Sequence, residues 1–498
     1  MRRLSPLLAI EAAALALWLG LAGWLLLSED TAGELRPIDP AALQAGPAAE
    51  TWFGIYFQDQ KVGYAVQSES PTADGGRLLR SRSAFEVAAF GEIKRIVTAS
   101  DALVDPQGQV SRFDFFMESD PVRILARGEV QDDQIIMELV QAGELQTLTL
   151  PIDERPQIQM SVSAWIADRE QDLAMGQVFE LPYFDPVTMA TQTMRLEIED
   201  VELVGSEEAY WVQRSVGDIE TRFLITPSGK VLREESALGF AMVAETREQA
   251  ETMPTGVEPV NIIALSAVQL TGGQLHQPRR TRVLSLVVHG VEAEKLRDEP
   301  PLQRIVGDTV TVTTPLLVEL PADLPKAETD PALQPWLGST LFMPLDHPDI
   351  QDKARDVIGD VRTRREAVQV LVDWVYGYLI KAPTMGVPNA LEILQVGQGD
   401  CNEHTALFVA LARAQGIPSR VAAGLVYSDS IGDDGAFYYH AWPEVYFGPE
   451  AGWVPVDPTF GQFPADATHV KVVEGDLDRQ VEIMGVMGRL SFELVEAR

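Results

Sequence analysis

The sequence predicts an α+β chain in which a large antiparallel β-rich region precedes a smaller domain of helices packed on strands. Apolar and polar residues alternate through 51–250 and again through 255–325, which is typical of strands. From about residue 346 the apolar residues recur at spacings of three and four, which is typical of helices. A long apolar run at 4–27 precedes both regions and predicts a transmembrane helix.

The composition is that of a folded and acidic protein. The 498 residues are 46% hydrophobic and 23% charged, so a globally disordered chain is excluded. Asp and Glu total 74 against 39 Lys and Arg, a formal net charge of −35. Because such a surface repels phosphate backbones, we expect no nucleic-acid partner. The single cysteine, Cys401, excludes an intramolecular disulfide and any multi-cysteine metal site.

Residues 1–28 are predicted to anchor the chain in a membrane. As a helix rising about 1.5 Å per residue, the run 4–27 covers a hydrocarbon core of about 30 Å. Arg2 and Arg3 precede it and acidic residues follow it, so we expect the rest of the chain on the periplasmic or extracellular side. A cleaved signal peptide is the alternative, although its apolar part normally spans about 7–15 residues. Residues 29–50, rich in Ala, Pro, Gly and acid, are predicted to be a linker.

Residues 51–250 are predicted to form an antiparallel β-rich domain with one helix, near 161–172, packed on its sheet. Segments such as TWFGIYFQ alternate apolar and polar residues and are separated by turn residues. A second β-rich segment at 251–335 contains TRVLSLVVHGVE. Neither region gathers an acid, a base and a nucleophile in a recognisable spacing, so we expect a binding or spacer role for both.

Residues 336–498 form the predicted catalytic domain, with helices first and strands later. A short helix is predicted at 389–394, and strands are predicted at 420–427, 437–447 and 453–457. Before them, one helix carries an apolar stripe that should face a core. The stripe consists of Ala367, Val368, Leu371, Trp374, Val375 and Tyr378.

The segment GDCNEHTALFVALARAQGIPSR contains signals for both ends of a buried helix. Asp400 is a good N-cap, Glu403 completes a capping box, and Gly416 followed by a proline ends the helix. Cys401 is then the first helical residue. Because the helix N-terminus favours a thiolate, we expect the pKa of Cys401 to fall below its usual value of about 8.5.

The two strands after this helix can bring a histidine and an aspartate together. If Phe447 pairs with Gly452 across the turn, Asp457 lies opposite Trp442, two residues from His440 on the same face. Diagonal neighbours of this kind are about 7–8 Å apart at the backbone. A carboxylate–imidazole hydrogen bond is therefore within reach.

Cys401, His440 and Asp457 have the chemistry of a thiol triad. The thiol would attack a carbonyl carbon, and the imidazole would accept the proton and later donate it. The carboxylate would fix the imidazole tautomer and stabilise the imidazolium. The backbone N–H of Cys401 is one candidate oxyanion donor, and the sequence does not identify a second.

Three segments together resemble the transglutaminase-like superfamily: GDCNEHTALFVALARAQGIPSRV, YHAWPEVYF and GWVPVDPTFGQ. The core motif of that family is Gly-Asp-Cys at a helix start, His-Ala-Trp on a strand and Asp-Pro-Thr after the next strand. Three motifs in the correct order are far more specific than a lone cysteine near a histidine. The resemblance covers about 345–475.

The resemblance implies a papain-like arrangement of a helix packed on an antiparallel sheet, in a membrane-anchored bacterial-type member. It assigns the nucleophile, the base and the orienting acid to Cys401, His440 and Asp457. No metal and no organic cofactor are implied, because the triad contains every group that the reaction requires.

Asp400, His404 and Trp442 are predicted to support the site. His404 lies three residues after Cys401 and could compete as the base. Because one helix rarely aims two side chains at a common substrate atom, we expect His404 to have a supporting role. We expect Trp442 to pack beside the catalytic histidine.

Asp466 and His469 follow the triad closely in sequence. They could be interpreted as a second dyad or as a metal pair. Because no third ligand is in view, we expect a structural hydrogen-bonding role for them.

The expected reaction forms a thioester with an acyl donor and then transfers the acyl group to an acceptor. Water as acceptor gives a peptidase or amidase, and a lysine amine gives protein cross-linking. The triad is the same in both cases, and we favour hydrolysis of a peptide or amide bond in a protein or peptide substrate. A non-catalytic, membrane-tethered interaction module is the third interpretation. The oligomeric state is not predicted.

Overall fold

The computed structural model describes residues 49–498 except for short gaps. The gaps are at 90–91, 107, 121, 142–143, 170–172, 187–189, 218, 237–238, 255, 257–258, 262–266, 341, 385–388, 431–434, 476–482, 484–485 and 487. The predicted anchor at 1–28 lies outside the described residues, as does the predicted linker at 29–50 except for its last two residues. Across the described part of the chain, no helix combines the length and the apolar character needed to span a bilayer.

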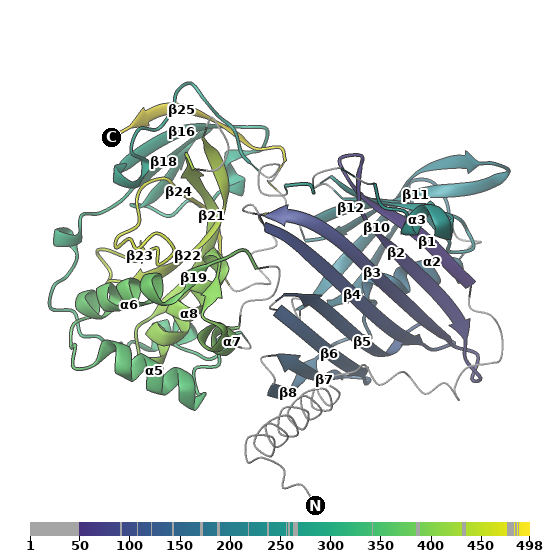
Figure 1. The fold of residues 1–498 in the computed structure, drawn as a ribbon, viewed down its shortest axis with the longest axis horizontal. Coiled ribbons are helices and arrows are strands. Elements are labelled where there is room, and N and C mark those ends of the chain that lie inside the picture. Colours follow the sequence, from purple (N-terminus) through teal and green to yellow (C-terminus); the bar gives the residue numbers. More distant parts are fainter. Residues whose placement is uncertain are drawn as a thin grey trace, which may run out of the picture.

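The first folded unit is a 14-stranded antiparallel sheet (Figure 1). Its order is β8-β7-β6-β5-β4-β3-β2-β1-β14-β13-β12-β11-β10-β9, so β1 and β14 pair in the middle and β8 and β9 form the edges. The strands are β1 (Ala49–Phe57), β2 (Gln60–Pro71), β3 (Arg77–Ala89), β4 (Glu92–Val104), β5 (Val110–Ser119), β6 (Val122–Val130), β7 (Gln134–Gln141), β8 (Glu144–Pro151), β9 (Val178–Asp185), β10 (Ala190–Val204), β11 (Glu207–Val216), β12 (Ile219–Ile225), β13 (Val231–Ser236) and β14 (Phe240–Glu245). The antiparallel sheet predicted from period-two alternation is confirmed.

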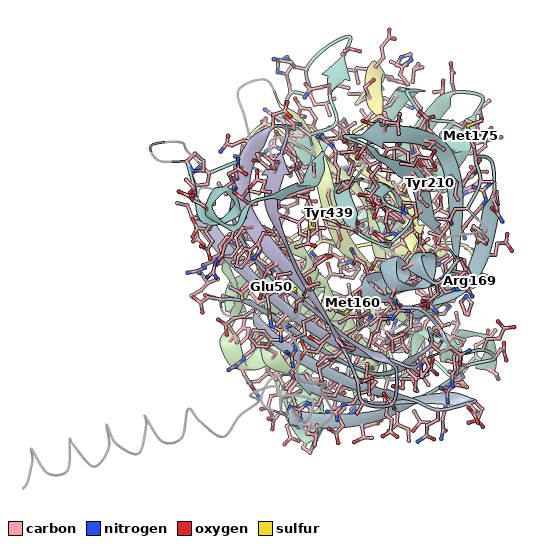
Figure 2. The ribbon with its side chains drawn as sticks, turned by 90° about the vertical axis from the view of Figure 1, so that its right-hand side faces the viewer. Glu50, Met160, Arg169, Met175, Tyr210 and Tyr439 are labelled. Atoms are coloured by element: carbon pink, nitrogen blue, oxygen red, sulfur yellow. The ribbon has the colours of Figure 1, made fainter. Side chains whose placement is uncertain are left out.

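The predicted helix near 161–172 is present as the short helix α2 (Val162–Ala167). Seen from the side in Figure 2, the large sheet curves strongly, and Met160 and Arg169 mark the two ends of the α2 segment. Ala164 packs with the apolar residues of β4–β8, whereas Trp165 packs with those of β10–β12. The helix therefore joins the two halves of the sheet on one face.

A second sheet of five strands has the order β15-β25-β16-β18-β17. These strands are β15 (Leu270–Thr271), β16 (Val283–His289), β17 (Gln303–Val306), β18 (Thr309–Thr313) and β25 (Ser491–Ala497). The C-terminal strand β25 pairs in parallel with β15 and antiparallel with β16. The sequence did not predict this strand, because its partners lie about 200 residues earlier in the chain.

The C-terminal part packs helices on a four-stranded sheet of order β23-β22-β21-β24, which confirms the predicted α+β class. Helix α8 lies between the other helices and strands β21 and β22 (Figure 1). The elements are α5 (Pro348–Ile358), α6 (Arg364–Tyr378), α7 (Ala390–Val396), α8 (Cys401–Ala414), β21 (Ser419–Ser428), β22 (Ala436–Tyr446), β23 (Trp453–Pro455) and β24 (His469–Glu474). The apolar stripe of α6 faces this core, as predicted.

A buried ionic cluster joins the five-stranded sheet to the four-stranded sheet. Arg420 on β21 pairs with Glu444 on β22 at 2.7 Å and with Glu299, before β17, at 2.6 Å. Lys471 on β24 pairs with Glu444 at 2.8 Å and also with Glu299. Two cations and two carboxylates therefore neutralise one another; Arg420, Lys471 and Glu444 are buried and Glu299 is partly exposed.

Candidate active site

Helix α8 begins where the capping pattern predicts. The Asp400 side chain accepts a hydrogen bond from the Asn402 N–H at 2.9 Å, and the Glu403 carboxylate accepts one from the Asp400 N–H at 2.8 Å. Both ends of the capping box are formed, so the first turn is held firmly. This fixes Cys401 as the first residue of a helix whose remaining turns are almost entirely buried.

The side chain of Cys401 is partly buried and faces strand β22, where the N–H of Ala441 donates a hydrogen bond to its sulfur. Burial raises the pKa of the Cys401 thiol well above its usual value, and the carboxylate of Asp400 raises it further. The predicted lowering of this pKa is wrong. A helix N-terminus contributes about 0.3–1 kcal/mol, whereas burial can shift a pKa by several units. The thiol is therefore neutral until a base removes its proton.

The structure brings His440 and Asp457 into contact. Glu444 pairs with Pro455 and Tyr446 with Trp453, so the predicted register between the two strands is confirmed. The Nε2 of His440 lies 2.9 Å from Oδ2 of Asp457.

The Asp457 carboxylate is fully buried, and four donors bind it. Oδ1 accepts the backbone N–H groups of Thr459 at 2.7 Å and Phe460 at 3.0 Å. Oδ2 accepts from two imidazoles, those of His440 and His469. Burial alone would raise the pKa of Asp457, but its contacts with the two histidines hold this pKa well below its usual value. The carboxylate is therefore charged at neutral pH.

His469 is the functional neighbour that sequence reasoning did not connect to the site. Its Nε2 lies 3.0 Å from Oδ2 of Asp457, and its Nδ1 lies 3.0 Å from the backbone carbonyl oxygen of Asp466. Burial opposes the charge, but the contacts with Asp457 and Asp466 outweigh it and raise the pKa of His469 to about 9. The signal that could have found it is a strand at 469–474, because β24 pairs with β21 beside β22.

His404 and Trp442 are both buried near this group. The Nδ1 of His404 lies 2.6 Å from the backbone carbonyl oxygen of Asp400, and burial lowers its pKa, so the ring is neutral. Its Nε2 has no hydrogen-bond partner among the described residues. The Trp442 ring stacks beside His440 at 6.1 Å between centroids and meets His469 edge-on at 5.1 Å.

Two side chains that the sequence did not single out, Phe460 and Arg279, lie next to one another beside His440. Phe460 stacks on the His440 ring at 5.1 Å between centroids and is 36% exposed. The Arg279 guanidinium lies 4.4 Å from the centroid of the Phe460 ring and pairs with Asp466 at 3.0 Å. Phe460 therefore lies against one face of the imidazole, and Arg279 lies against Phe460.

The atoms of His440, Asp457 and His469 that could bind a metal lie within 4.8 Å of one another. Both imidazoles already donate to the same Asp457 oxygen. A metal would have to displace both protons from a fully buried group. We therefore assign the cluster to hydrogen bonding.

A family model matches the part of the chain that contains Cys401, His440 and Asp457. Residues 351–458 match the model of the transglutaminase-like superfamily. Over 127 residues the chain is 33% identical to the protein-glutamine gamma-glutamyltransferase of Pseudomonas aeruginosa, which covers 22% of this chain and 19% of that protein. Over 196 residues it is 26% identical to an uncharacterized protein of Mycobacterium tuberculosis, which covers 34% of this chain and 61% of that protein.

A solved structure of a candidate cysteine protease from Cytophaga hutchinsonii is also similar. It is 18% identical and has a TM-score of 0.29, and the match covers 44% of this chain and 87% of that one. A likeness at this TM-score supports no further argument. The chain spans less than two thirds of the length of either sequence relative.

Proposed function

Because residues 351–458 form a domain of the transglutaminase-like superfamily, we propose that this chain is a cysteine enzyme that forms a thioester on Cys401. His440 is the proposed general base and Asp457 the residue that orients it. The observation that carries the proposal is the 2.9 Å contact between His440 and Asp457, next to the residue whose N–H binds the Cys401 sulfur.

The proposed steps follow from which atoms are already bonded. Nε2 of His440 is bound to Asp457, so Nδ1 is the nitrogen left to accept the thiol proton. As the proton moves to Nδ1, the Cys401 sulfur attacks the carbonyl carbon of the substrate. The imidazolium then returns the proton to the leaving amine, and the thioester remains. An acceptor attacks the thioester and releases the thiol.

We propose water as the acceptor, and therefore hydrolysis of a peptide or amide bond in a protein or peptide. Amine transfer is the second candidate, and the similarity to the Pseudomonas aeruginosa enzyme favours it. We further propose that the apolar run at 4–27 tethers the chain to a membrane with the catalytic part on the exported side.

The acceptor is tested by product mass. The purified full-length chain is incubated with glutamine-containing peptides, with and without a primary amine. Cleavage with a gain of water supports hydrolysis. Loss of ammonia with a gain equal to the amine supports transfer and overturns hydrolysis. The same products from Cys401→Ala would overturn both.

The role of His440 is tested by labelling the single cysteine with iodoacetamide. We expect His440→Ala to slow alkylation of Cys401 at neutral pH, because a neutral thiol needs a neighbouring base. The matched control is His347→Ala, at the N-cap of α5, which should alkylate at the wild-type rate. Equal rates in wild type and His440→Ala would contradict the proposed base and favour the non-catalytic interpretation.

A further inference from the structure

The imidazole of His469, which lies outside the proposed triad, contacts the same Asp457 carboxylate as His440. The same Asp457 oxygen, Oδ2, lies 2.9 Å from Nε2 of His440 and 3.0 Å from Nε2 of His469. The other oxygen, Oδ1, accepts two backbone N–H groups. His440 must therefore share its carboxylate oxygen with a second donor.

The acceptors around His469 define its charge. Its Nε2 faces a carboxylate oxygen and its Nδ1 faces a backbone carbonyl oxygen. Both acceptors lack a proton to give, so each ring nitrogen must carry its own. The ring is therefore an imidazolium, with its centroid 5.6 Å from that of His440.

A shell of fixed contacts holds this cation. The Asp466 carboxylate beside it accepts hydrogen bonds from Thr468 at 2.8 Å and Gln462 at 2.9 Å, and pairs with Arg279 at 3.0 Å. The side chain of His469 is 1% exposed. Neither the ring nor its carboxylate can leave without breaking several buried contacts.

We propose that His469 is a positioning residue of the active site, one that holds the Asp457 carboxylate in place and limits how strongly its Oδ2 binds His440. The proposal rests on the proposed function. Because Oδ2 of Asp457 serves two donors, it binds each of them less strongly than it would bind one alone.

The other charged and titratable groups around Cys401, His404 and Phe460 come from three elements. Asp400, Glu403 and His404 lie at the start of α8, Lys381 lies on β19 (Ile380–Lys381), and Arg279 lies over Phe460. None of the described groups duplicates the second contact on Asp457. Replacing His469 with glutamine removes the charged donor, so Oδ2 of Asp457 should bind His440 more strongly.

The test uses the full-length chain with its six histidines labelled with nitrogen-15. In the wild type at pH 7 we expect proton-bearing signals from both ring nitrogens of His469, and a neutral His469 would overturn the proposal. In His469→Gln we expect a stronger hydrogen bond from His440 to Asp457, seen as a downfield shift of the His440 Nε2 proton signal. This measurement also remains available if the variant folds poorly, because the wild-type signals alone can refute the idea.

The matched control is His289→Gln. His289 lies on β16, is half exposed and pairs with Glu493. This variant should leave the His440 Nε2 proton signal unchanged, and an equal shift of that signal in both variants would overturn the proposal. An activity measurement distinguishes failure of the proposed function from failure of the proposed role of His469. If His440 shifts as expected but Cys401→Ala still turns over substrate, the proposed function fails and the coupling between the histidines stands.

Discussion

The buried ionic cluster gives a quantitative prediction about stability. Lys471 is 4% exposed and binds both Glu299 and Glu444, while Arg420 binds the same two carboxylates. Replacing Lys471 with Met leaves the buried Glu444 and the partly exposed Glu299 with Arg420 as the single cation that binds both. Removing one partner of a buried pair costs about 3–5 kcal/mol, so Lys471→Met should lose that much free energy of unfolding.

Urea unfolding followed by tryptophan fluorescence measures this loss. Trp453 is a natural reporter because the Arg420 guanidinium lies 4.4 Å from its ring centroid. The control is Arg355→Met. Its pair with Asp352 is 65% exposed on both sides, so the change should stay within about 0.5 kcal/mol.

The double variant Lys471→Met/Glu444→Gln tests whether charge is the cause. It restores neutrality, with Arg420 facing the single carboxylate of Glu299. We expect it to recover at least about 2 kcal/mol of the loss. The reasoning would be refuted if Lys471→Met cost no more free energy of unfolding than Arg355→Met. It would also be refuted if the loss in the double variant equalled the sum of the losses in Lys471→Met and Glu444→Gln.

Three further predictions concern His469 and two glycines. The pKa of His469 is raised from 6.5 to about 9, so its contribution of about 3 kcal/mol is complete below pH 6.5 and is lost as the pH rises through 9. The stability difference between wild type and His469→Gln in urea should therefore close between about pH 6 and pH 10, and a constant difference would contradict this. Gly424→Ala would place its Cβ 2.1 Å from the Val470 carbonyl oxygen and 3.0 Å from the Trp442 ring, so it should cost about 1–3 kcal/mol in thermal unfolding. Gly377 lies in α6, and a Cβ there has nothing within 4 Å, so Gly377→Ala should stabilise the chain by about 0.5–1 kcal/mol. If Gly424→Ala proved more stable to heat than Gly377→Ala, the space around the new Cβ would not decide the outcome.

Local signals allowed the start of α8 and the register of β22 with β23 to be predicted from sequence. The capping residues lie within four positions of Cys401, and the hairpin turn fixes which residues face each other. Both features depend on neighbours in the chain. The sequence alone therefore predicts that His440 and Asp457 lie on one face.

The parts that could not be predicted depend on distant segments. His469 reaches Asp457 because β24 pairs with β21, about 45 residues earlier, and β25 pairs with strands about 200 residues earlier. The raised pKa of Cys401 comes from burial in the folded chain, which a helix start alone does not reveal. Short-range patterns contain neither kind of information.

The pairing of β1 with β14 determines how the large sheet is inserted in the chain. Trp52 near the start of the unit lies opposite Glu245 at its end, and paired residues are about 4.5–5.5 Å apart. The first and last strands of this unit thus lie side by side in the sheet. They are therefore held together by the hydrogen bonds of the β1–β14 ladder.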